Sequence, residues 1–265
     1  MAKRPIARKP GTRTSSAATS VVVAIIPARL ASTRLPNKVL LARTGKPLIQ
    51  HVYESAKRSR VLSRVVIAAD HEAIRRAVVG FGGECVMTRV NHPNGTSRLA
   101  EAARKLRLND NDIVVNVQGD EPEMERAFVA AAVKALRTTG AQAATVAVPL
   151  DPSDDPSNPN IVKVVVSKQG RAMYFSRSPI PFVRDPGSST QSLLRHVGLY
   201  VYRVGFLKKY VTLAPAPPEI AESLEQLRVL WHGASMAVAV CPGRAPAGID
   251  TPEQYDAFVA RVMGT

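Results

Sequence analysis

Runs of apolar, β-branched residues alternate with amphipathic stretches over the first 150 residues of the chain. The run at 21–26 has no polar interruption, which is typical of a strand buried on both faces of a parallel sheet. Similar runs predict further strands at 64–69, 84–88, 112–117 and 143–149. Apolar positions with helical spacing predict helices between them, at 48–56, 71–79, 97–106 and 125–137. This alternation predicts an α/β fold built on a doubly wound, mostly parallel sheet.

The pattern changes after residue 150. The segment 151–160, DPSDDPSNPN, predicts a loop at a lobe boundary, and the strand-like stretches at 162–166, 172–175 and 196–202 follow without helices between them. We therefore expect an inserted antiparallel lobe at 151–230 that covers the main sheet or mediates dimerisation. A helix at 217–230, a late strand at 236–240 and a final helix beginning near 250 complete the pattern.

The loop after the first strand carries side chains suited to an anion. Pro27 is expected to end that strand, which places the loop at the carboxyl end of a parallel strand, where open α/β sheets bind ligands. Its cations and hydroxyls belong to Arg29, Ser32, Thr33, Arg34 and Lys38. The loop has neither the GxxxxGK(S/T) pattern of an ATPase nor the GxGxxG pattern of a dinucleotide fold. A solvated basic turn is the alternative interpretation.

Polar side chains also follow the third and fourth predicted strands. Gln118-Gly119-Asp120-Glu121-Pro122 comes directly after a buried strand, and hard oxygen ligands there suit Mg²⁺, although an acidic turn before a helix is the alternative. In the loop 89–97, Gly95 permits close approach of the backbone to a ligand, and Thr96 or Ser97 is a candidate helix cap. Asp70 is the expected N-cap of the helix at 71–79.

Composition and charge narrow the classes of protein and ligand that fit this chain. The 265 residues are 45% hydrophobic and can bury a substantial core, and no apolar run approaches the roughly 20 residues that span a bilayer. The net charge is +15, of which five charges lie in the acid-free first 20 residues, which we interpret as a disordered basic tail rather than a transit peptide. The basic body suits a polyanionic small molecule, nucleic acid or an acidic surface, but no nucleic-acid-binding motif is present. Cys85 and Cys241 lack metal-site spacing and are expected to be buried, reduced thiols.

Seven short motifs carry a family resemblance. In chain order they are PARLASTRLPNK, DHEAI, VNVQGDEP, YFSR, LRHVGLY, LEQLR and IDTPEQ. Together they resemble the CMP-Kdo synthetases, the 3-deoxy-manno-octulosonate cytidylyltransferases of lipopolysaccharide assembly, over about 21–258. The resemblance implies a nucleotidyltransferase fold over 21–265, a cytoplasmic homodimer, and transfer of CMP from CTP to Kdo with Mg²⁺ and release of pyrophosphate.

The resemblance also implies roles for particular residues. The nucleotide would contact Ala28, Arg29, Ser32, Lys38, Gly95 and Thr96. The catalytic set would be Arg29, Arg34, Lys38, Asp120 and Asp250, with Asp120 and Asp250 as the metal ligands. The sugar acid would contact Gln118, Arg177, His196, Tyr200, Glu225 and Gln226. We expect the late strand to pack beside the strand at 112–117, which would bring Asp120 and Asp250 to one rim of the sheet.

Two departures from the family pattern and two other functions stay open. Ser97 stands where the family commonly has an acidic residue, and 182–192 is short beside the family's acidic linker. The first alternative function is CMP activation of another ulosonic acid, such as an 8-amino or sialic-type sugar. The second is a catalytically silent, basic binding protein, against which Gln118, Asp120 and Asp250 argue.

Overall fold

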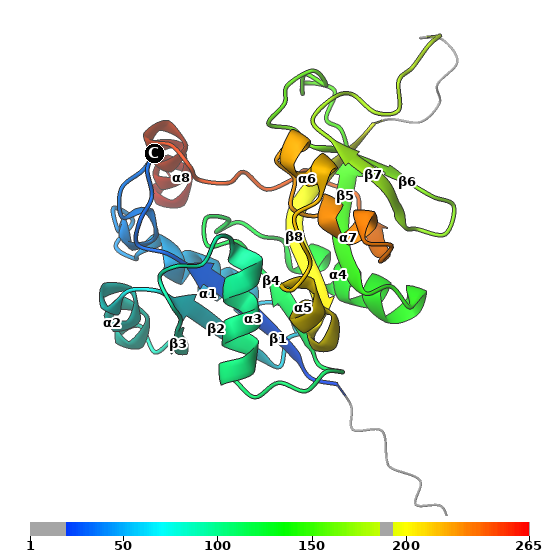
Figure 1. The fold of residues 1–265 in the computed structure, drawn as a ribbon. Helices are drawn as coiled ribbons and strands as arrows, with labels where there is room; N and C mark the ends of the chain where they lie inside the picture. The colour runs from blue at the N-terminus through cyan, green and yellow to red at the C-terminus, as the bar shows by residue number, and fades with distance from the viewer. Residues whose placement is uncertain (1–19, 186–192, 265) are drawn as a thin grey trace, which may run out of the picture.

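The computed structural model describes residues 20–185 and 193–264, and its centre is a mixed β-sheet (Figure 1). Within the described residues the sheet has the strand order β3-β2-β1-β4-β8-β5-β9. The strands are β1 (Val22–Ala28), β2 (Arg64–Ala69), β3 (Cys85–Met87), β4 (Ile113–Asn116), β5 (Ala143–Pro149), β8 (Leu194–Arg203) and β9 (Met236–Val240). The basic tail at 1–19 and most of the 182–192 linker lie outside the described residues.

Helices cover both faces of the sheet, as the doubly wound prediction requires. Alternate residues of β1 enter two separate cores: Val22, Ala24 and Ile26 face one, whereas Val23 and Ile25 face the other. The first core packs against α1 (Leu48–Lys57), α2 (Glu72–Gly80) and α4 (Arg126–Thr139). The second packs against α3 (Gly95–Lys105), α5 (Val204–Tyr210) and α7 (Leu227–Trp231), and Figure 1 views the sheet from the side of α3 and α5. The α/β fold class is therefore confirmed.

The antiparallel strand β8 lies inside this sheet, between β4 and β5. It has apolar residues on both faces, with Leu199 and Val201 in one core and Tyr202 in the other, which suits an interior position. The expected inserted lobe is therefore only partly separate: β6 (Lys163–Val166) and β7 (Ala172–Ser176) form a hairpin that joins β8 at Lys163. The expected position of the late strand was wrong, because β9 pairs with β5 while β8 occupies the place beside β4.

Pro27 does not end the first strand. β1 continues to Ala28, and Pro27 pairs with Ala68 of β2. On its other side, β4 pairs with β1 only as far as Ile25. A proline lacks the N–H that a strand between two neighbours needs, and here only one neighbour remains.

The helix predicted at 217–230 is two short helices, α6 (Pro217–Glu222) and α7. Ser223 breaks the helix with a left-handed backbone (φ 50°). After the break Leu224 and Gln226 are both buried, although their positions would lie on different faces of one continuous helix. The break therefore turns Gln226 inward, whereas one continuous amphipathic helix would leave it off the apolar face.

The fold also bears on the two cysteines and on whether any helix could cross a membrane. Cys85 and Cys241 are free, but each is partly rather than fully buried, which differs from the expected burial. Among the described residues, no helix combines the length and apolar composition required to cross a bilayer.

Candidate functional site

The first candidate pocket lies at the carboxyl ends of β1 and β4 and has a volume of about 460 Å³. We call it the cationic pocket. Three loops and one distant aspartate form it, and its polar lining is Arg29, Ser32, Thr33, Arg34, Lys38, His92, Asn94, Arg98, Gln118, Asp120 and Asp250. The structure thus brings together the residues that the sequence predicts for phosphate and metal, and it adds Arg98. Ala28 and Thr96 are buried instead and do not line this pocket.

Two carboxylates converge on one cation in this pocket. The Nζ atom of Lys38 lies 2.7 Å from Oδ2 of Asp120 and 2.8 Å from Oδ1 of Asp250. Arg34 reaches the other oxygen of Asp250 at 2.8 Å. Burial raises the pKa of Asp250, but the bonds and charges of Lys38 and Arg34 outweigh this effect, so the pKa is lowered and the carboxylate stays charged.

A long connection brings Asp250 to this place. From the end of β9 the chain crosses back over the molecule to α8 (Pro252–Met263), which packs near the start of α1 (Figure 1). The N–H of Ile249 donates to the carbonyl of Asp120 at 2.9 Å, and the Ile249 side chain is buried. Asp250 is not the helix cap, because the Thr251 side chain accepts the bond from the Gln254 N–H. Its carboxylate is therefore available for the pocket.

The carboxylate pair fits a magnesium ion. Asp120 and Asp250 already share a single cation, the Lys38 ammonium, so their oxygens can approach one small positive centre. The described residues contain no cluster of three or more histidine, cysteine or acidic side chains suited to a metal. Mg²⁺ usually takes one or two protein carboxylates and completes its shell with substrate phosphates and water, which agrees with this donor set.

Asp70 and Arg98 hold the loops of the cationic pocket in place. Asp70 accepts the Leu30 N–H at 3.0 Å and the Arg98 guanidinium at 3.0 Å. The prediction of Asp70 as a helix cap was wrong, since the His71 side chain accepts the Ala73 N–H and caps α2. Arg98 is buried although it lies on α3, so amphipathic spacing gave no signal for it.

The loop before α3 depends on a buried glutamate. Glu101 accepts His92 Nε2 at 2.5 Å and the Arg89 N–H at 3.0 Å, and pairs with Lys105 at 3.0 Å. Burial raises the pKa of Glu101, but the bonds from these donors outweigh that effect and lower the pKa to about 2. At the start of α3 the cap is Asn94 rather than Thr96 or Ser97, and the Ser97 hydroxyl instead contacts His92 at 3.1 Å.

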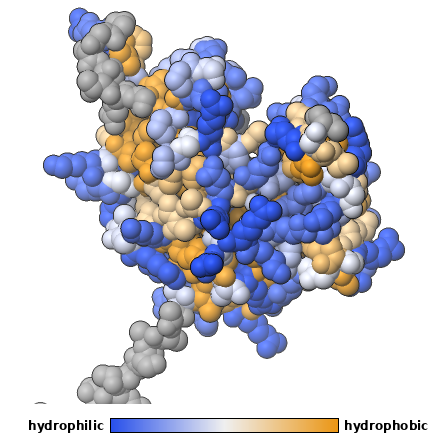
Figure 2. Space-filling view, turned by 180° about the vertical axis from the view of Figure 1, so that it is seen from behind, coloured by the Kyte–Doolittle hydropathy of each residue, from blue (hydrophilic) through white to orange (hydrophobic). Residues whose placement is uncertain are grey.

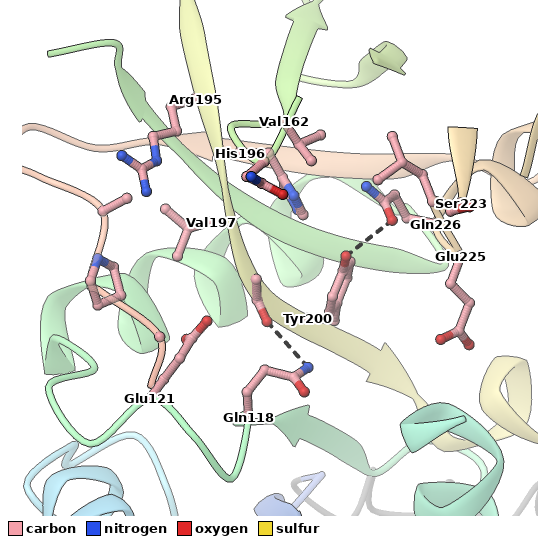
Figure 3. Close-up of a pocket in the computed structure, with 16 residues that line it drawn as sticks. Gln118, Glu121, Val162, Arg195, His196, Val197, Tyr200, Ser223, Glu225 and Gln226 are labelled. Atoms are coloured by element: carbon pink, nitrogen blue, oxygen red, sulfur yellow. Dashed lines mark hydrogen bonds between the residues drawn. The ribbon is translucent and has the colours of Figure 1, made fainter. Parts of the chain in front are cut away.

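The second candidate pocket opens along β8 and has a volume of about 420 Å³ (Figure 3). We call it the β8 pocket. Its polar lining is Gln118, Glu121, Asn160, Arg195, His196, Tyr200, Ser223, Glu225 and Gln226. Gln118 lines both pockets and donates to the carbonyl of Gly198 at 3.4 Å, so it marks the boundary between them.

Several polar groups of the β8 pocket are buried without a partner. The Tyr200 hydroxyl donates to Oε1 of Gln226 at 3.1 Å, while Nε2 of Gln226 and Oε2 of Glu121 have no hydrogen-bond partner in the described part of the chain. Burial and then the Glu225 and Glu121 charges raise the pKa of Tyr200 above its ordinary value, so the phenol stays protonated. Buried polar groups are rarely left unpaired, so these atoms are suited to a polar ligand.

Glu121 is a pocket residue that the sequence interpretation did not assign to the sugar acid. Burial, followed by the charges of Asp120 and Asp250, raises its pKa to about 8. Its carboxyl group packs on Gly198, where an added Cβ would lie 3.0 Å from Oε1. Glu121 is placed in the β8 pocket by its contact with β8, 77 positions away in the sequence. The local sequence therefore could not predict that Glu121 lines this pocket.

Glu225 and Arg177 differ in their placement. Glu225 lines the β8 pocket and accepts a hydrogen bond from the Tyr210 hydroxyl at 3.2 Å, and burial raises the pKa of Glu225.

Arg177 lies outside both pockets, and its guanidinium donates to the carbonyls of Glu222 and Ser223, at 2.6 and 3.2 Å, and to a third carbonyl. Arg177 therefore stabilises the backbone where α6 ends and α7 has not yet begun. The prediction that Arg177 lies in the sugar pocket was wrong. The arginine that lines the β8 pocket is Arg195, which pairs with Asp154 at 3.0 Å.

Comparisons with known proteins show which family this chain is similar to. A family model described as "Cytidylyltransferase" matches residues 23–236. A Syntrophobacter fumaroxidans protein named 3-deoxy-manno-octulosonate cytidylyltransferase is 48% identical over 239 residues, covering 90% of this chain and 95% of the relative. A Serratia proteamaculans protein of the same name is 48% identical over 247 residues, covering 91% and 99%.

Solved structures extend the comparison. A CMP:2-keto-3-deoxy-manno-octonic acid synthetase complexed with CTP has a TM-score of 0.86 and 39% identity, covering 92% of this chain and 99% of that one. A cytidylyltransferase from Leptospira borgpetersenii has a TM-score of 0.57 at 17% identity, covering 93% and 88%, and shows the shared fold alone.

Proposed function

The chain belongs to the cytidylyltransferase family, and we propose that it transfers CMP from CTP to 3-deoxy-manno-octulosonate (Kdo), releasing pyrophosphate. The observation that carries the proposal is the junction at Gln118 between two unlike pockets. The cationic pocket suits a triphosphate, and the β8 pocket offers unpaired hydrogen-bonding groups to a polyhydroxylated acid. A nucleotidyl transfer needs these two ligands to meet at one boundary.

The residues of the cationic pocket have distinct tasks in this proposal. Arg29, Arg34 and Lys38 bind and neutralise the triphosphate, and Ser32 donates to it. Asp120 and Asp250 would hold Mg²⁺, which supplies charge neutralisation at the phosphates when it is bound. The loop at 92–95 would border the ribose and cytosine, and its shape depends on the His92–Glu101 contact.

The reaction follows from positioning. The anomeric hydroxyl of the sugar acid, held near Gln118, attacks the α-phosphorus; the new P–O bond forms in line with the bond that releases pyrophosphate. Charge on the phosphate oxygens is the main obstacle, and fixed cations in a partly buried site lower that barrier most. The chain's own contribution is therefore to orient two ligands and to stabilise charge.

Pyrophosphate release tests the proposal directly. With CTP and Mg²⁺, Kdo should give rapid release, and an 8-amino analogue or a sialic acid should give at least about tenfold lower kcat/KM, as expected for a pocket with buried polar groups. Faster release with another ulosonic acid would identify that acid as the substrate. No release with any of them would favour a silent binding protein.

The proposal includes a homodimer in the cytoplasm, serving lipopolysaccharide assembly as the family resemblance implies. Large apolar side chains are exposed near the β6–β7 hairpin and the α6–α7 region: Met173, Tyr174, Phe182, Ile220 and Trp231. Figure 2 shows hydrophobic surface on the side of the molecule that carries the hairpin. Exposed patches of this kind commonly mark protein interfaces. Sedimentation equilibrium should give twice the chain mass, and a monomer at micromolar concentration would contradict the dimer.

A further inference from the structure

One buried threonine lies behind the β8 pocket and touches its histidine. Thr145 of β5 has no exposed surface, and its Oγ1 lies 2.8 Å from Nε2 of His196. The same oxygen lies 2.7 Å from the carbonyl oxygen of Leu199 and 3.3 Å from that of Val197. These contacts occur at a bulge, because Gly198 and Leu199 have no partner in β5. Thr145 therefore bonds both the irregular backbone and the imidazole.

The position of the hydroxyl hydrogen follows from these partners. A carbonyl oxygen can only accept, so the short contact with Leu199 requires Thr145 to donate its single hydrogen there. The hydroxyl then has only lone pairs left for His196. Nε2 of His196 must therefore carry the proton and donate to Oγ1, which leaves Nδ1 unprotonated in the neutral ring.

The surroundings of His196 keep the ring neutral and fixed. Burial is the cause that lowers its pKa, to about 3. Phe175 packs edge-on at 5.0 Å between ring centroids, and Tyr200 lies at 5.4 Å. Nδ1 has no hydrogen-bond partner within 20–185 and 193–264, and the ring lines the β8 pocket (Figure 3). An uncharged nitrogen with a free lone pair is thus available to a ligand.

We propose that Thr145 is a positioning residue for sugar recognition: it fixes the Nε2–H tautomer of His196, so that Nδ1 accepts a hydrogen bond from a hydroxyl of the sugar acid. This inference rests on the proposed function, since it concerns the same pocket. It complements the unpaired groups nearby, because Glu121 Oε2 offers a second unpaired oxygen and Gln226 Nε2 offers a donor. The pocket would then demand a hydroxyl that donates at His196, and a deoxy or O-methyl sugar would lose that bond.

The test compares Thr145→Val, which keeps the shape and removes the hydroxyl, with Thr145→Ser, which keeps the hydroxyl. In ¹⁵N-histidine NMR of the ligand-free enzyme, wild type and Thr145→Ser should show His196 protonated at Nε2, and Thr145→Val should show a mixture of tautomers. Thr145→Val should raise KM for Kdo at least about fivefold with little change in KM for CTP, and Thr145→Ser should restore it. Thr138→Val, on the exposed side of α4, is the matched control.

A double-mutant cycle separates positioning from simple packing. In a His196→Phe background, Thr145→Val should add no further rise in KM for Kdo, because the nitrogen on which Thr145 acts is gone. An Nδ1–H tautomer in wild type, an equal rise in KM for CTP, or an unchanged penalty in the His196→Phe background would each overturn the inference. Absence of pyrophosphate release by wild type with Kdo would instead refute the proposed function.

Discussion

The two pockets recognise their ligands by opposite means. In the cationic pocket, charged side chains are already paired with one another, as Lys38 is with Asp120 and Asp250. In the β8 pocket, the decisive groups are neutral, such as the His196 imidazole, or have no hydrogen-bond partner in the described part of the chain, such as Gln226 Nε2. A charged ligand must displace existing ion pairs in the first pocket, whereas a polar ligand completes missing hydrogen bonds in the second.

This difference separates catalysis from selectivity. Charged side chains in a partly buried site interact strongly with a phosphate. Substitutions in the cationic pocket should therefore reduce turnover with every acceptor sugar. Unpaired hydrogen-bonding groups penalise ligands that fail to match them, so changes in the β8 pocket should alter the choice of sugar. Substitutions in the two pockets should therefore affect different kinetic parameters.

The largest effect should come from the carboxylate pair. Asp120→Asn and Asp250→Asn should each lower kcat by at least about two orders of magnitude at similar melting temperature, because a main electrostatic stabiliser is lost. Steady-state kinetics with thermal melting checks this result. Asp256→Asn, at an exposed position of α8, the helix that follows Asp250, is the control. Near-normal turnover of Asp250→Asn at low Mg²⁺ would show that Asp250 is not a metal ligand.

A smaller loss should follow removal of a cation from the same pocket. Lys38→Ala and Arg34→Ala each delete a charge-assisted bond worth about 1.5–3 kcal/mol, so kcat/KM for CTP should fall roughly tenfold or more. The losses should be the same with Kdo and with a slower analogue. Lys46→Ala, whose ion pair with Glu54 is at the surface, should change little. Unchanged CTP kinetics in both pocket variants would contradict the phosphate assignment.

The β8 pocket should give the reverse pattern. Gln226→Leu removes the amide that bonds Tyr200 and offers a free N–H, so KM for Kdo should rise about fivefold or more while CTP binding is retained. Kinetics with each substrate varied in turn measures both constants. Gln169→Leu is a matched control on an exposed loop. An equal loss of CTP binding would mean that Gln226 serves the fold or the nucleotide.

The smallest effect concerns stability and pH. The folded-state pKa of His196 is lowered from 6.5 to about 3, so below pH 6.5 the unfolded chain binds a proton that the folded chain does not. This group should therefore reduce the free energy of unfolding by about 1 kcal/mol between pH 7 and pH 5.5. Denaturant titrations of wild type and His196→Phe at both pH values measure it as the part of the pH dependence that the substitution removes. Equal pH dependence would place a charged imidazole in the folded state.

The cationic pocket was largely predictable, because its ligands follow buried strands directly. Arg29 and Asp120 lie within four residues of the ends of β1 and β4, Lys38 lies in the loop after β1, and parallel strands end at one edge. The β8 pocket was less predictable from the sequence. Its shape depends on the bulge at Gly198 and on the break at Ser223, which arise from contacts between distant segments. Arg177 was misplaced for the same reason, since two of its carbonyl partners, those of Glu222 and Ser223, lie at the end of α6 where the helix breaks.

The position of β8 has a consequence for the order of folding. β1 to β4 can assemble from neighbouring βα units, but β5 and β9 reach that half of the sheet only through β8, which follows β5 by more than 40 residues. Such a long-range closure is slow compared with local pairing. The strand that joins the two halves also carries His196 and Tyr200. We therefore expect sugar binding to appear with the final closure of the sheet, after the loops for the nucleotide have formed.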